Sequence, residues 1–346
     1  MTTAPQGHVT WQSPSNIAIV KYWGKKAQQI PMNPSLSMTL SRSVTHTSVT
    51  YRPKQAGETL YSFSFHQKAK ESFSPKLESF FGHVLDKYPQ LGHYHFEVQS
   101  SNSFPHSAGI ASSASAMSAL ALCIEEIALA LAGTRSTFSP IGASELSRLG
   151  SGSAVRSLHP QWAVWGKTDA LPGSDDHFAS PLVKVDNVFT DFCDTILIVD
   201  SSQKDVSSTA GHRLMDNHPY KEGRLQQAHR HIRLAIDAIG TGNLPLFIEV
   251  CEEEALSLHA LMMSSHPGYL LMKPATLQIM DKVRRFRDRT GIAVAFTLDA
   301  GPNVHLLYPR AQRHDVLEWI HAELLPLCEN NRWIDDHMGH GPTKTR

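Results

Sequence analysis

Apolar and polar positions alternate in short runs through the first half of the chain, a pattern typical of β-strands. Residues 46–53 and 93–101 show this alternation with β-branched and aromatic side chains. Residues 16–20 form an almost continuous apolar run, which indicates a buried strand. The first half is therefore expected to consist mainly of strands.

A long helix is predicted after Gly109, ending near Ala132, where Gly133 supplies a stop signal. Its residues are apolar on nearly every side except at Glu125 and Glu126. Such a helix is expected to be buried, against a sheet, and to span roughly 30 Å.

The second half alternates between helical and strand patterns. The predicted strands are 195–202 and two further strands around the turn 299–303, and the predicted helices are 222–239, 244–263, 274–290 and 314–325. The polar tail after the last helix is expected to be mobile. The pattern predicts an α+β fold with two lobes, divided between Lys184 and Asp194.

The composition excludes several classes of protein. The 346 residues contain 32 Lys+Arg and 32 Asp+Glu, whereas nucleic-acid and membrane-surface proteins carry an excess of one sign. The 20 histidines are scattered and form no HExxH pair, so most are interpreted as surface or core residues. We therefore expect neither a nucleic-acid nor a membrane partner, and no dedicated metal site.

The cysteines and the apolar runs favour a soluble cytoplasmic protein. The four cysteines form no CxxC motif and are expected to be reduced and buried: Cys123, Cys193, Cys251 and Cys328. The N-terminal residues lack an apolar signal core. The most apolar run, 119–124, stops at Glu125 and is too short to cross a membrane.

The start of the long helix is a candidate phosphate site. Small residues would let phosphate oxygens approach the free N–H groups of its first turn, and Ser112 and Ser113 add hydroxyl donors. The alternative is a tightly packed helix that needs small residues for close contact. The segment is not a Walker A loop, because GxxxxGK[ST] is absent.

Two further segments are candidate anion sites. Lys21 follows the strand 16–20 and either faces an anion or extends into solvent. Ser-Gly-Ser at 151–153 offers closely spaced hydroxyl and N–H donors, and Arg156 would add bidentate hydrogen bonds to a carboxylate or phosphate. The alternative for this second segment is a flexible linker.

Asp299 lies in a turn between two apolar strands. Aspartate in such a turn commonly bonds its own backbone. The flanking strands look buried, however, so the turn is expected to face a cleft, where a carboxylate beside cations orients or deprotonates a hydroxyl.

Together these segments resemble one family. "PHSAGIASSAS" (105–115) is similar to the Pro-x-x-x-Gly-Leu-x-Ser-Ser-Ala motif of the GHMP kinases. "NIAIVKYWGKK", "NPSLSMTLS", "SGSAVRSL" and "TLDAGPNVHLL" resemble the narrower diphosphomevalonate decarboxylase family, in that family's own order from Asn16 to about Leu307.

The resemblance implies a GHMP kinase fold with an ATP-binding, ribosomal S5-like lobe (1–188) and a ferredoxin-like lobe (189–346), the active site lying between them. It implies an ATP-dependent decarboxylase that converts (R)-5-diphosphomevalonate to isopentenyl diphosphate, with ADP, phosphate and CO2 as further products. ATP and Mg²⁺ are the expected cofactors, and a homodimer is the expected assembly.

The resemblance also implies the roles of individual residues. The catalytic residues would be Asp299, Lys21 and Arg156. Substrate binding would use Tyr22, Trp23, Gly24, Lys25, Ser151, Gly152, Ser153, Ala154, Val155, Arg156, Lys204 and Thr209. The ATP loop would comprise Ser103, Pro105, Ser107, Ala108, Gly109, Ala111, Ser112 and Ser113.

Four positions depart from the family pattern: His106 stands where Thr is common, Ile110 where the pattern has Leu, Pro34 where Ser is usual, and Val155 where Cys is typical. They leave open a preference for the monophosphate, a mevalonate 3-kinase, or a GHMP-fold protein that binds a ligand without turnover. The sequence does not locate the family's additional arginine, for which Arg52 and Lys68 are candidates. Nor does it decide whether Asp299 is a base or an orienting group.

Overall fold

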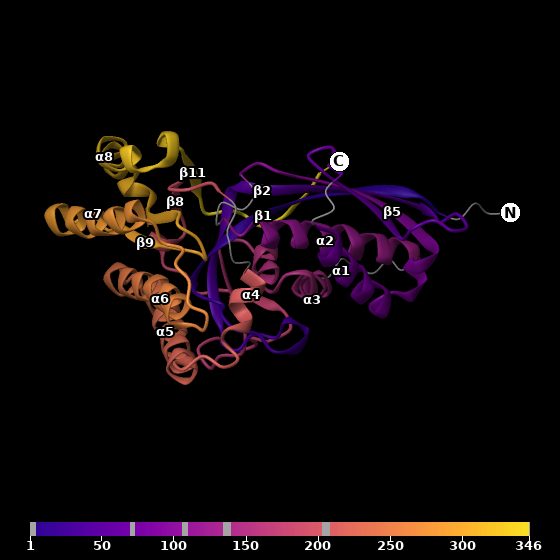
Figure 1. Cartoon of the computed structure of the whole chain (residues 1–346), viewed down its shortest axis with the longest axis horizontal. Helices are drawn as coiled ribbons and strands as arrows, with labels where there is room; N and C mark the ends of the chain where they lie inside the picture. The colour runs from indigo at the N-terminus through magenta and orange to yellow at the C-terminus, as the bar shows by residue number, and fades with distance from the viewer. Residues whose placement is uncertain (1–4, 70–72, 106–109, 134–139, 203–207, 346) are drawn as a thin grey trace.

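The computed structural model describes residues 5–69, 73–105, 110–133, 140–202 and 208–345. Two lobes lie side by side along the long axis of the molecule (Figure 1). One contains a large sheet with helices on one face, and the other contains a smaller sheet with its own helices. The predicted α+β fold with two lobes is confirmed.

The first lobe is built on a sheet in which β12, β1, β2, β5, β3 and β4 lie in that order, with β6 pairing β2 and β7. Only β3 and β5 run parallel among these pairs. The strands are β1 (Gly7–Val20), β2 (Ser35–Pro53), β3 (Tyr61–Phe65), β4 (Lys68–Ala69), β5 (Tyr94–Asn102), β6 (Trp162–Trp165), β7 (Ala179–Pro181) and β12 (Thr343–Thr345). The helices are α1 (Ser74–Lys87), α2 (Ser112–Leu131) and α3 (Pro140–Gly150), followed by the 3-10 helix η4 (Gly152–Leu158).

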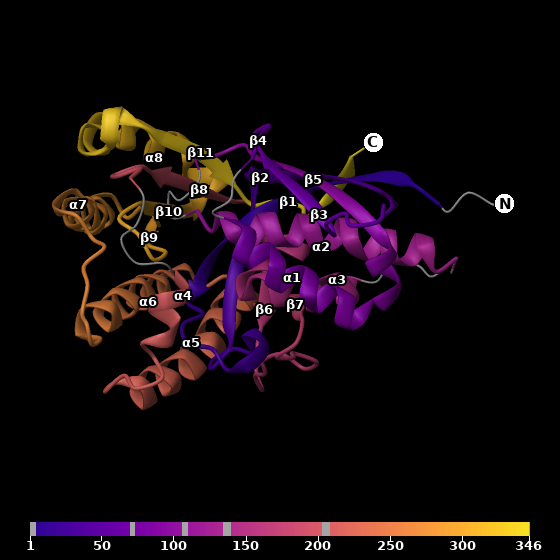
Figure 2. The same ribbon diagram turned by 45° about the vertical axis from the view of Figure 1, so that its right-hand side comes forward.

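Helix α2 is the long helix expected from the sequence, and it ends where Gly133 adopts φ +63°. It packs against β1 and β2, with α1 and α3 beside it (Figures 1 and 2). Within the described residues it is the one helix long and apolar enough to cross a membrane, although 72% of its apolar window is buried. The expectation that the apolar run is too short was thus wrong on length, because apolar residues continue on both sides of Glu125 and Glu126 within this 20-residue helix. Its burial makes α2 a core helix.

The second lobe carries an antiparallel sheet in the order β11, β8, β10, β9. Its strands are β8 (Phe192–Leu197), β9 (Ala295–Thr297), β10 (Val304–Pro309) and β11 (Trp333–His337), and its helices are α4 (Ser208–Arg213), α5 (Lys221–Thr241), α6 (Leu244–Ser264), α7 (Pro274–Thr290) and α8 (Arg313–Trp319). Helix α7 has the predicted bounds, with Pro274 in its first turn and Gly291 at φ +73° after its end.

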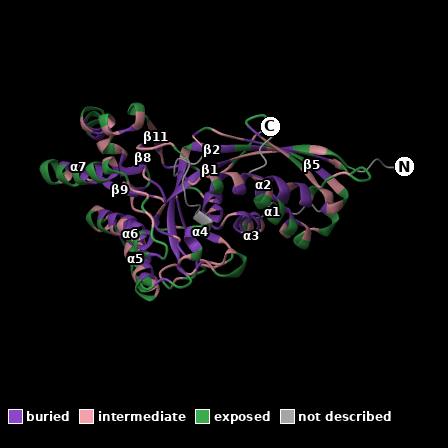
Figure 3. Cartoon of the chain, in the orientation of Figure 1, coloured by how far each residue is buried: buried purple, intermediate pink, exposed green. Residues whose placement is uncertain are grey.

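The expectation of a mobile tail was wrong. Strand β11 pairs with β8 inside the second sheet, and β12 pairs with β1 at the edge of the first. The chain therefore returns from the second lobe to the first, and its end lies near the N-terminal lobe (Figure 1). Buried residues continue from one lobe into the other (Figure 3), because one apolar cluster contains residues of β1, β2, α5 and α6.

Candidate active site

Lys21 lies directly after β1 and is only 1% exposed. Its ammonium group donates to the Ala18 carbonyl oxygen and, over 2.8 Å, to Thr297 Oγ1 in β9. Burial lowers the pKa of Lys21, while Asp299 and further acidic groups act in the opposite direction. The side chain is thus held at the contact between the lobes and does not extend into solvent.

Arg156 projects from η4 and is 2% exposed. Its Nε donates to Ser37 Oγ over 3.1 Å, and a terminal nitrogen donates to Ser35 Oγ over 2.6 Å. Both serines belong to the motif "NPSLSMTLS" on β2. Burial lowers the pKa of Arg156 to about 10, with Asp299 and Tyr22 opposing the shift. The guanidinium therefore remains a cation at neutral pH.

Asp299 follows β9 and is partly buried. Its carbonyl oxygen lies 3.1 Å from His259 Nε2 and accepts from the Gly301 N–H over 2.7 Å. Burial lowers the pKa of Lys21, of Arg156 and of His212, and the Asp299 carboxylate opposes this lowering in each case, so its charge lies close enough to interact with all three. The structure thus brings Lys21, Arg156 and Asp299 together from three separate elements.

The residues after Lys21 form an aromatic wall with a histidine that the sequence did not indicate. The His212 ring packs against Tyr22 at 4.4 Å and against Trp23 at 4.7 Å, measured between ring centroids. The Gly24 N–H donates to His212 Nδ1 over 3.0 Å. Gly24 has φ +89°, and an added Cβ would lie 2.7 Å from the Met32 sulfur, so this turn requires glycine.

The Tyr22 hydroxyl oxygen is buried and has no hydrogen-bond partner within the described part of the chain. It lies against Gly152, where an added Cβ would be 2.8 Å from it. A buried hydroxyl without a partner is costly, and a polar ligand at this position would satisfy it.

Lys25 is half-buried, and its ammonium donates to Gln29 Oε1 over 3.0 Å. Burial, followed by the Arg213 guanidinium, lowers its pKa. Arg213 is thus a further cation near this segment that sequence reasoning missed.

The segment 151–156 meets both the strand β1 and the start of α2. Asn16 Nδ2 donates to the Ser153 carbonyl oxygen and to Ser157 Oγ. The Ser151 and Ser113 hydroxyl oxygens lie 3.1 Å apart. The side chains of Ala154 and Val155 pack into apolar clusters, so only their backbone is available to a ligand. The interpretation of this segment as a flexible linker is therefore wrong.

The predicted ATP loop is described in part. Ser103 donates to the Arg42 carbonyl oxygen over 2.6 Å and thus ties β5 to β2. Pro105 is partly buried, and Ala111 precedes α2 with a left-handed φ of 44°. Ser107, Ala108 and Gly109 lie outside the described residues, as do His106, Lys204 and the side chain of Thr209.

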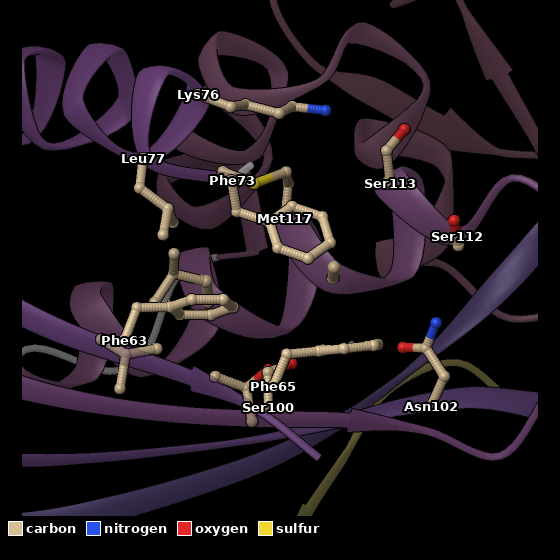
Figure 4. Close-up of a pocket in the computed structure, with 14 residues that line it drawn as sticks. Phe63, Phe65, Phe73, Lys76, Leu77, Ser100, Asn102, Ser112, Ser113 and Met117 are labelled. Carbon is tan, nitrogen blue, oxygen red and sulfur yellow. The ribbon is translucent and has the colours of Figure 1, made fainter. Parts of the chain in front are cut away.

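Ser112 and Ser113 lie beside an apolar cavity that sequence reasoning missed (Figure 4). Aromatic side chains of β3 and the start of α1 meet methionine and leucine side chains of α1 and α2. The exposed Lys76 side chain lies along one side of the cavity, with its ammonium group directed toward Ser113 (Figure 4). The principal lining residues are Phe63, Phe65, Phe73, Lys76, Leu77, Met117 and Leu120. Their contributions come from separate elements, and no local motif marks them.

Arg52 is not part of the site. It lies near the end of β2 opposite to Ser35, roughly 50 Å along the strand, and its guanidinium pairs with Glu58. Lys68 lies in β4, at the edge of the first sheet. Arg148 is a nearer cation and is 4% exposed. Its charge acts to lower the pKa of Tyr22, against the effect of burial. Its guanidinium donates to the carbonyl oxygens of Gln28 and His177.

No group of three or more histidine, cysteine or acidic residues able to hold a metal occurs among the residues that the structure describes. Oxygen-bearing side chains that suit a hard cation carried by a nucleotide do line the cavity, among them those of Asn102, Ser112 and Ser113.

Comparisons with known proteins indicate one family. Residues 13–179 match the family model of the diphosphomevalonate decarboxylase-like N-terminal domain, and residues 195–341 match that of the mevalonate 5-diphosphate decarboxylase C-terminal domain. The chain is 30% identical over 315 residues to the diphosphomevalonate decarboxylase of Saccharomyces cerevisiae, covering 86% of this chain and 76% of the relative.

Two solved structures are similar over nearly the whole chain. Mevalonate diphosphate decarboxylase from Staphylococcus aureus is 28% identical with a TM-score of 0.86, covering 99% of each chain. A complex described as MDDEF with MVAPP, AMPPCP and magnesium is 28% identical with a TM-score of 0.85, covering 99% of this chain and 100% of the other.

Proposed function

The chain belongs to the diphosphomevalonate decarboxylase family, and on that premise we propose which of its residues carry out the reaction. The enzyme catalyses the ATP-dependent decarboxylation of (R)-5-diphosphomevalonate to isopentenyl diphosphate, releasing ADP, phosphate and CO2. The observation that carries our proposal is the convergence of Lys21, Arg156 and Asp299, one carboxylate and two buried cations.

ATP is assigned to the cavity at the start of α2. The apolar and aromatic walls suit the adenine ring, and the free N–H groups and hydroxyls at Ser112 and Ser113 suit its phosphates. Lys76 extends over the same space and would pair with a phosphate oxygen. Mg²⁺ bound to ATP would neutralise part of the phosphate charge during transfer, and the two serine hydroxyls are suitable ligands for it.

The diphosphate end of the substrate is assigned to the wall formed by Tyr22, Trp23, Gly24 and Lys25 and to the facing segment 151–156. The buried Tyr22 hydroxyl would donate to a diphosphate oxygen, which would remove the cost of its missing partner. Lys25 and Arg213 supply positive charge at the same end. With the diphosphate bound there, the mevalonate carbon chain would extend toward Lys21 and Asp299.

Asp299 is assigned to the 3-hydroxyl group. Its carboxylate would accept the hydroxyl hydrogen bond and orient the oxygen toward the γ-phosphorus of ATP. Phosphoryl transfer would break the bond between the γ-phosphorus and the ADP oxygen, form a bond to the 3-oxygen, and release the hydroxyl proton to Asp299 or to solvent. The C3–O bond then breaks, and its electron pair leaves with the phosphate. The C1–C2 bond then breaks as CO2 departs, and its electrons form the C2=C3 double bond.

Lys21 and Arg156 are assigned to the negative charge that moves during these steps. Arg156 is fixed by Ser35 and Ser37, so little reorganisation is needed when the 3-phosphate leaves. Removal of one such donor typically costs about 10²–10³ in rate.

The test uses carboxyl-labelled (R)-5-diphosphomevalonate with ATP and Mg²⁺, and measures labelled CO2 and ADP together. We expect equal release of both by the wild type, a loss of at least about 100-fold in Asp299→Asn, and full activity in the surface control Asp315→Asn. ADP without CO2 would indicate a 3-kinase, and turnover of the monophosphate alone would change the substrate. Neither product, with ligand binding retained, would indicate a non-catalytic protein.

We also propose that the enzyme is cytoplasmic and forms a homodimer. The four cysteines are free and buried, which suits a reducing compartment. Light scattering in solution tests the assembly: a dimer has twice the 38.3 kDa mass of the chain, and a monomer would contradict the proposal.

A further inference from the structure

The peptide groups on both sides of Lys21 are held by the opposite lobe. The Lys21 N–H donates to Glu254 Oε2 in α6 over 2.8 Å. The Lys21 carbonyl oxygen accepts from Arg224 in α5 over 3.1 Å and from Asn33 Nδ2 over 2.9 Å. The backbone of this residue is therefore fixed at its nitrogen and at its carbonyl by side chains distant in the sequence.

Glu254 has no exposed surface and takes part in several charge-assisted hydrogen bonds. Arg224 donates to both of its carboxylate oxygens at 2.7 Å, and His231 Nδ1 lies 2.7 Å from Oε1. Burial acts to raise the pKa of Glu254, but Arg224, His231 and the Lys21 N–H outweigh it and lower the pKa to about 2. The carboxylate is therefore ionised at neutral pH.

A buried ion pair of this kind is weak evidence for stability, because apolar side chains of similar volume often stabilise a protein as well or better. Helices α5 and α6 already share a large apolar cluster with β1. What distinguishes this pair is its position, because both charged groups bond the backbone of Lys21. Glu254 accepts from the Lys21 N–H, and Arg224 donates to the Lys21 carbonyl oxygen.

We propose that Glu254, together with Arg224, is a positioning residue that holds Lys21 against the reacting groups and couples its placement to the contact between the lobes. This inference rests on the role proposed above for Lys21. Glu254 acts by geometry, through the backbone of Lys21, and by charge, because its carboxylate favours the ammonium form of Lys21.

The charged and titratable groups that face Lys21 come from several elements. Asp299 follows β9, Cys251 and Glu254 lie on α6, Arg156 lies on η4, and Asp194 lies on β8. Burial and Arg156 lower the pKa of Lys21, and the Glu254 carboxylate acts against them. Removal of that negative charge should therefore lower the pKa of Lys21 further, so that its ammonium form is lost at a lower pH.

The experiment compares Glu254→Gln with Glu253→Gln. Glu253 is the neighbouring residue, its side chain is 44% exposed, and it lies 3.0 Å from the other nitrogen of His231, yet it has no contact with Lys21 among the described hydrogen bonds. We expect Glu254→Gln to lower kcat by about 10-fold to 100-fold with little change in the KM for ATP. The alkaline limb of its kcat profile should move to lower pH by about one unit. Glu253→Gln should match the wild type in both.

A double-mutant cycle with Lys21→Met separates positioning from a structural effect. If Glu254 acts through Lys21, Glu254→Gln should cause little further loss of kcat in the Lys21→Met background. Should Glu254→Gln fail to fold, Arg224→Lys replaces it, because a lysine cannot bond both carboxylate oxygens and the Lys21 carbonyl; it should lower kcat in the same direction.

The proposal is overturned if Glu254→Gln and Glu253→Gln have the same kcat and alkaline limb. It is equally overturned if the loss in kcat is undiminished in the Lys21→Met background. A wild type that releases no CO2 would instead contradict the proposed function, and a fully active Lys21→Met would contradict the role of Lys21. The failures of the two proposals are thereby distinguished.

Discussion

The hydroxyl oxygens of Ser113 and Ser151 lie 3.1 Å apart, one in the first turn of α2 and the other immediately before η4. The first turn of α2 is the proposed ATP phosphate site, and η4 carries Arg156. This contact is therefore a direct link between the part of the site assigned to ATP and the part assigned to the substrate.

Ser151→Ala removes that link while leaving the backbone donors of both segments. We expect the KM for ATP and the KM for the diphosphate substrate to rise together, by about 3-fold to 10-fold, because a hydrogen bond of about 1 kcal/mol no longer fixes Ser113. Steady-state kinetics with each substrate varied measures this. Ser264→Ala is the control, because it loses a bond to Ala260 in its own helix and a 3.4 Å contact with His218 Nε2, and it leaves Ser113 and Ser151 unchanged. A rise in one KM alone would contradict the coupling.

Lys76 is the cation that extends over the apolar cavity. Lys76→Met keeps most of its length and removes its charge, so we expect the KM for ATP to rise by about 10-fold, the value of one charge-assisted hydrogen bond. The KM for the diphosphate substrate should change little. Lys87→Met at the other end of α1, where the lysine pairs with Glu125 and Glu145, is the matched control. If the two substitutions change the KM for ATP equally, the assignment of ATP to this cavity would be contradicted.

Sequence patterns predicted the elements whose signals are local. Helix α7 has proline in its first turn and glycine after its end, and the apolar strands around Asp299 are flanked by turn residues. The positions of Lys21, Arg156 and Asp299 also followed from local motifs. All these signals lie within about a dozen neighbouring residues.

The missed residues depend on contacts between distant segments. Glu254 lies in the acidic run "CEEE", which is typical of a solvated helix face, and only the packing of α5, α6 and β1 buries it. The polar tail lacks a clear strand pattern because the neighbouring strands, β8 and β1, supply its partners. The aromatic side chains that line the cavity, Phe63, Phe65 and Phe73, come from β3 and the start of α1, and the sequence did not predict either element individually.

His212 lies against Tyr22 and Trp23, and its setting disfavours protonation. Burial lowers the pKa of His212 to about 3, Lys25 and Arg156 act in the same direction, and Asp299 opposes them. The folded pKa is below the unfolded value of about 6.5, so the unfolded chain binds a proton first as the pH falls. The stability from neutral His212 is therefore fully present above about pH 6.5 and is lost toward pH 3.

We accordingly expect the free energy of unfolding of the wild type to fall more steeply between pH 6.5 and pH 4 than that of His212→Gln, whose amide oxygen still accepts the Gly24 N–H. Urea unfolding at several pH values measures the difference. NMR should show the imidazole neutral at pH 5 with its proton on Nε2, because Nδ1 accepts. A histidine that titrates near pH 6.5 in the folded protein would contradict this account.

Asp336 joins the two lobes through the backbone. It is fully buried in β11, and its carboxylate accepts the N–H groups of Ser41, Arg42 and Ser43 in β2, as well as that of His337. Asp336→Asn replaces one acceptor oxygen with a donor, so at least one buried N–H loses its partner. We expect a loss of about 1–3 kcal/mol in the free energy of unfolding, measured by urea denaturation.

Asp335→Asn is the matched control, because the neighbouring aspartate uses its side chain on Arg42 and Arg313, which are at least partly exposed. Solvent screens such pairs, so the cost should stay below about 1 kcal/mol. Since Asp336 connects the two sheets, its substitution should also lower the cooperativity of unfolding, seen as a smaller m-value. Equal losses in the two variants would mean that the hydrogen bonds of Asp336 do not contribute measurably to the contact between the lobes.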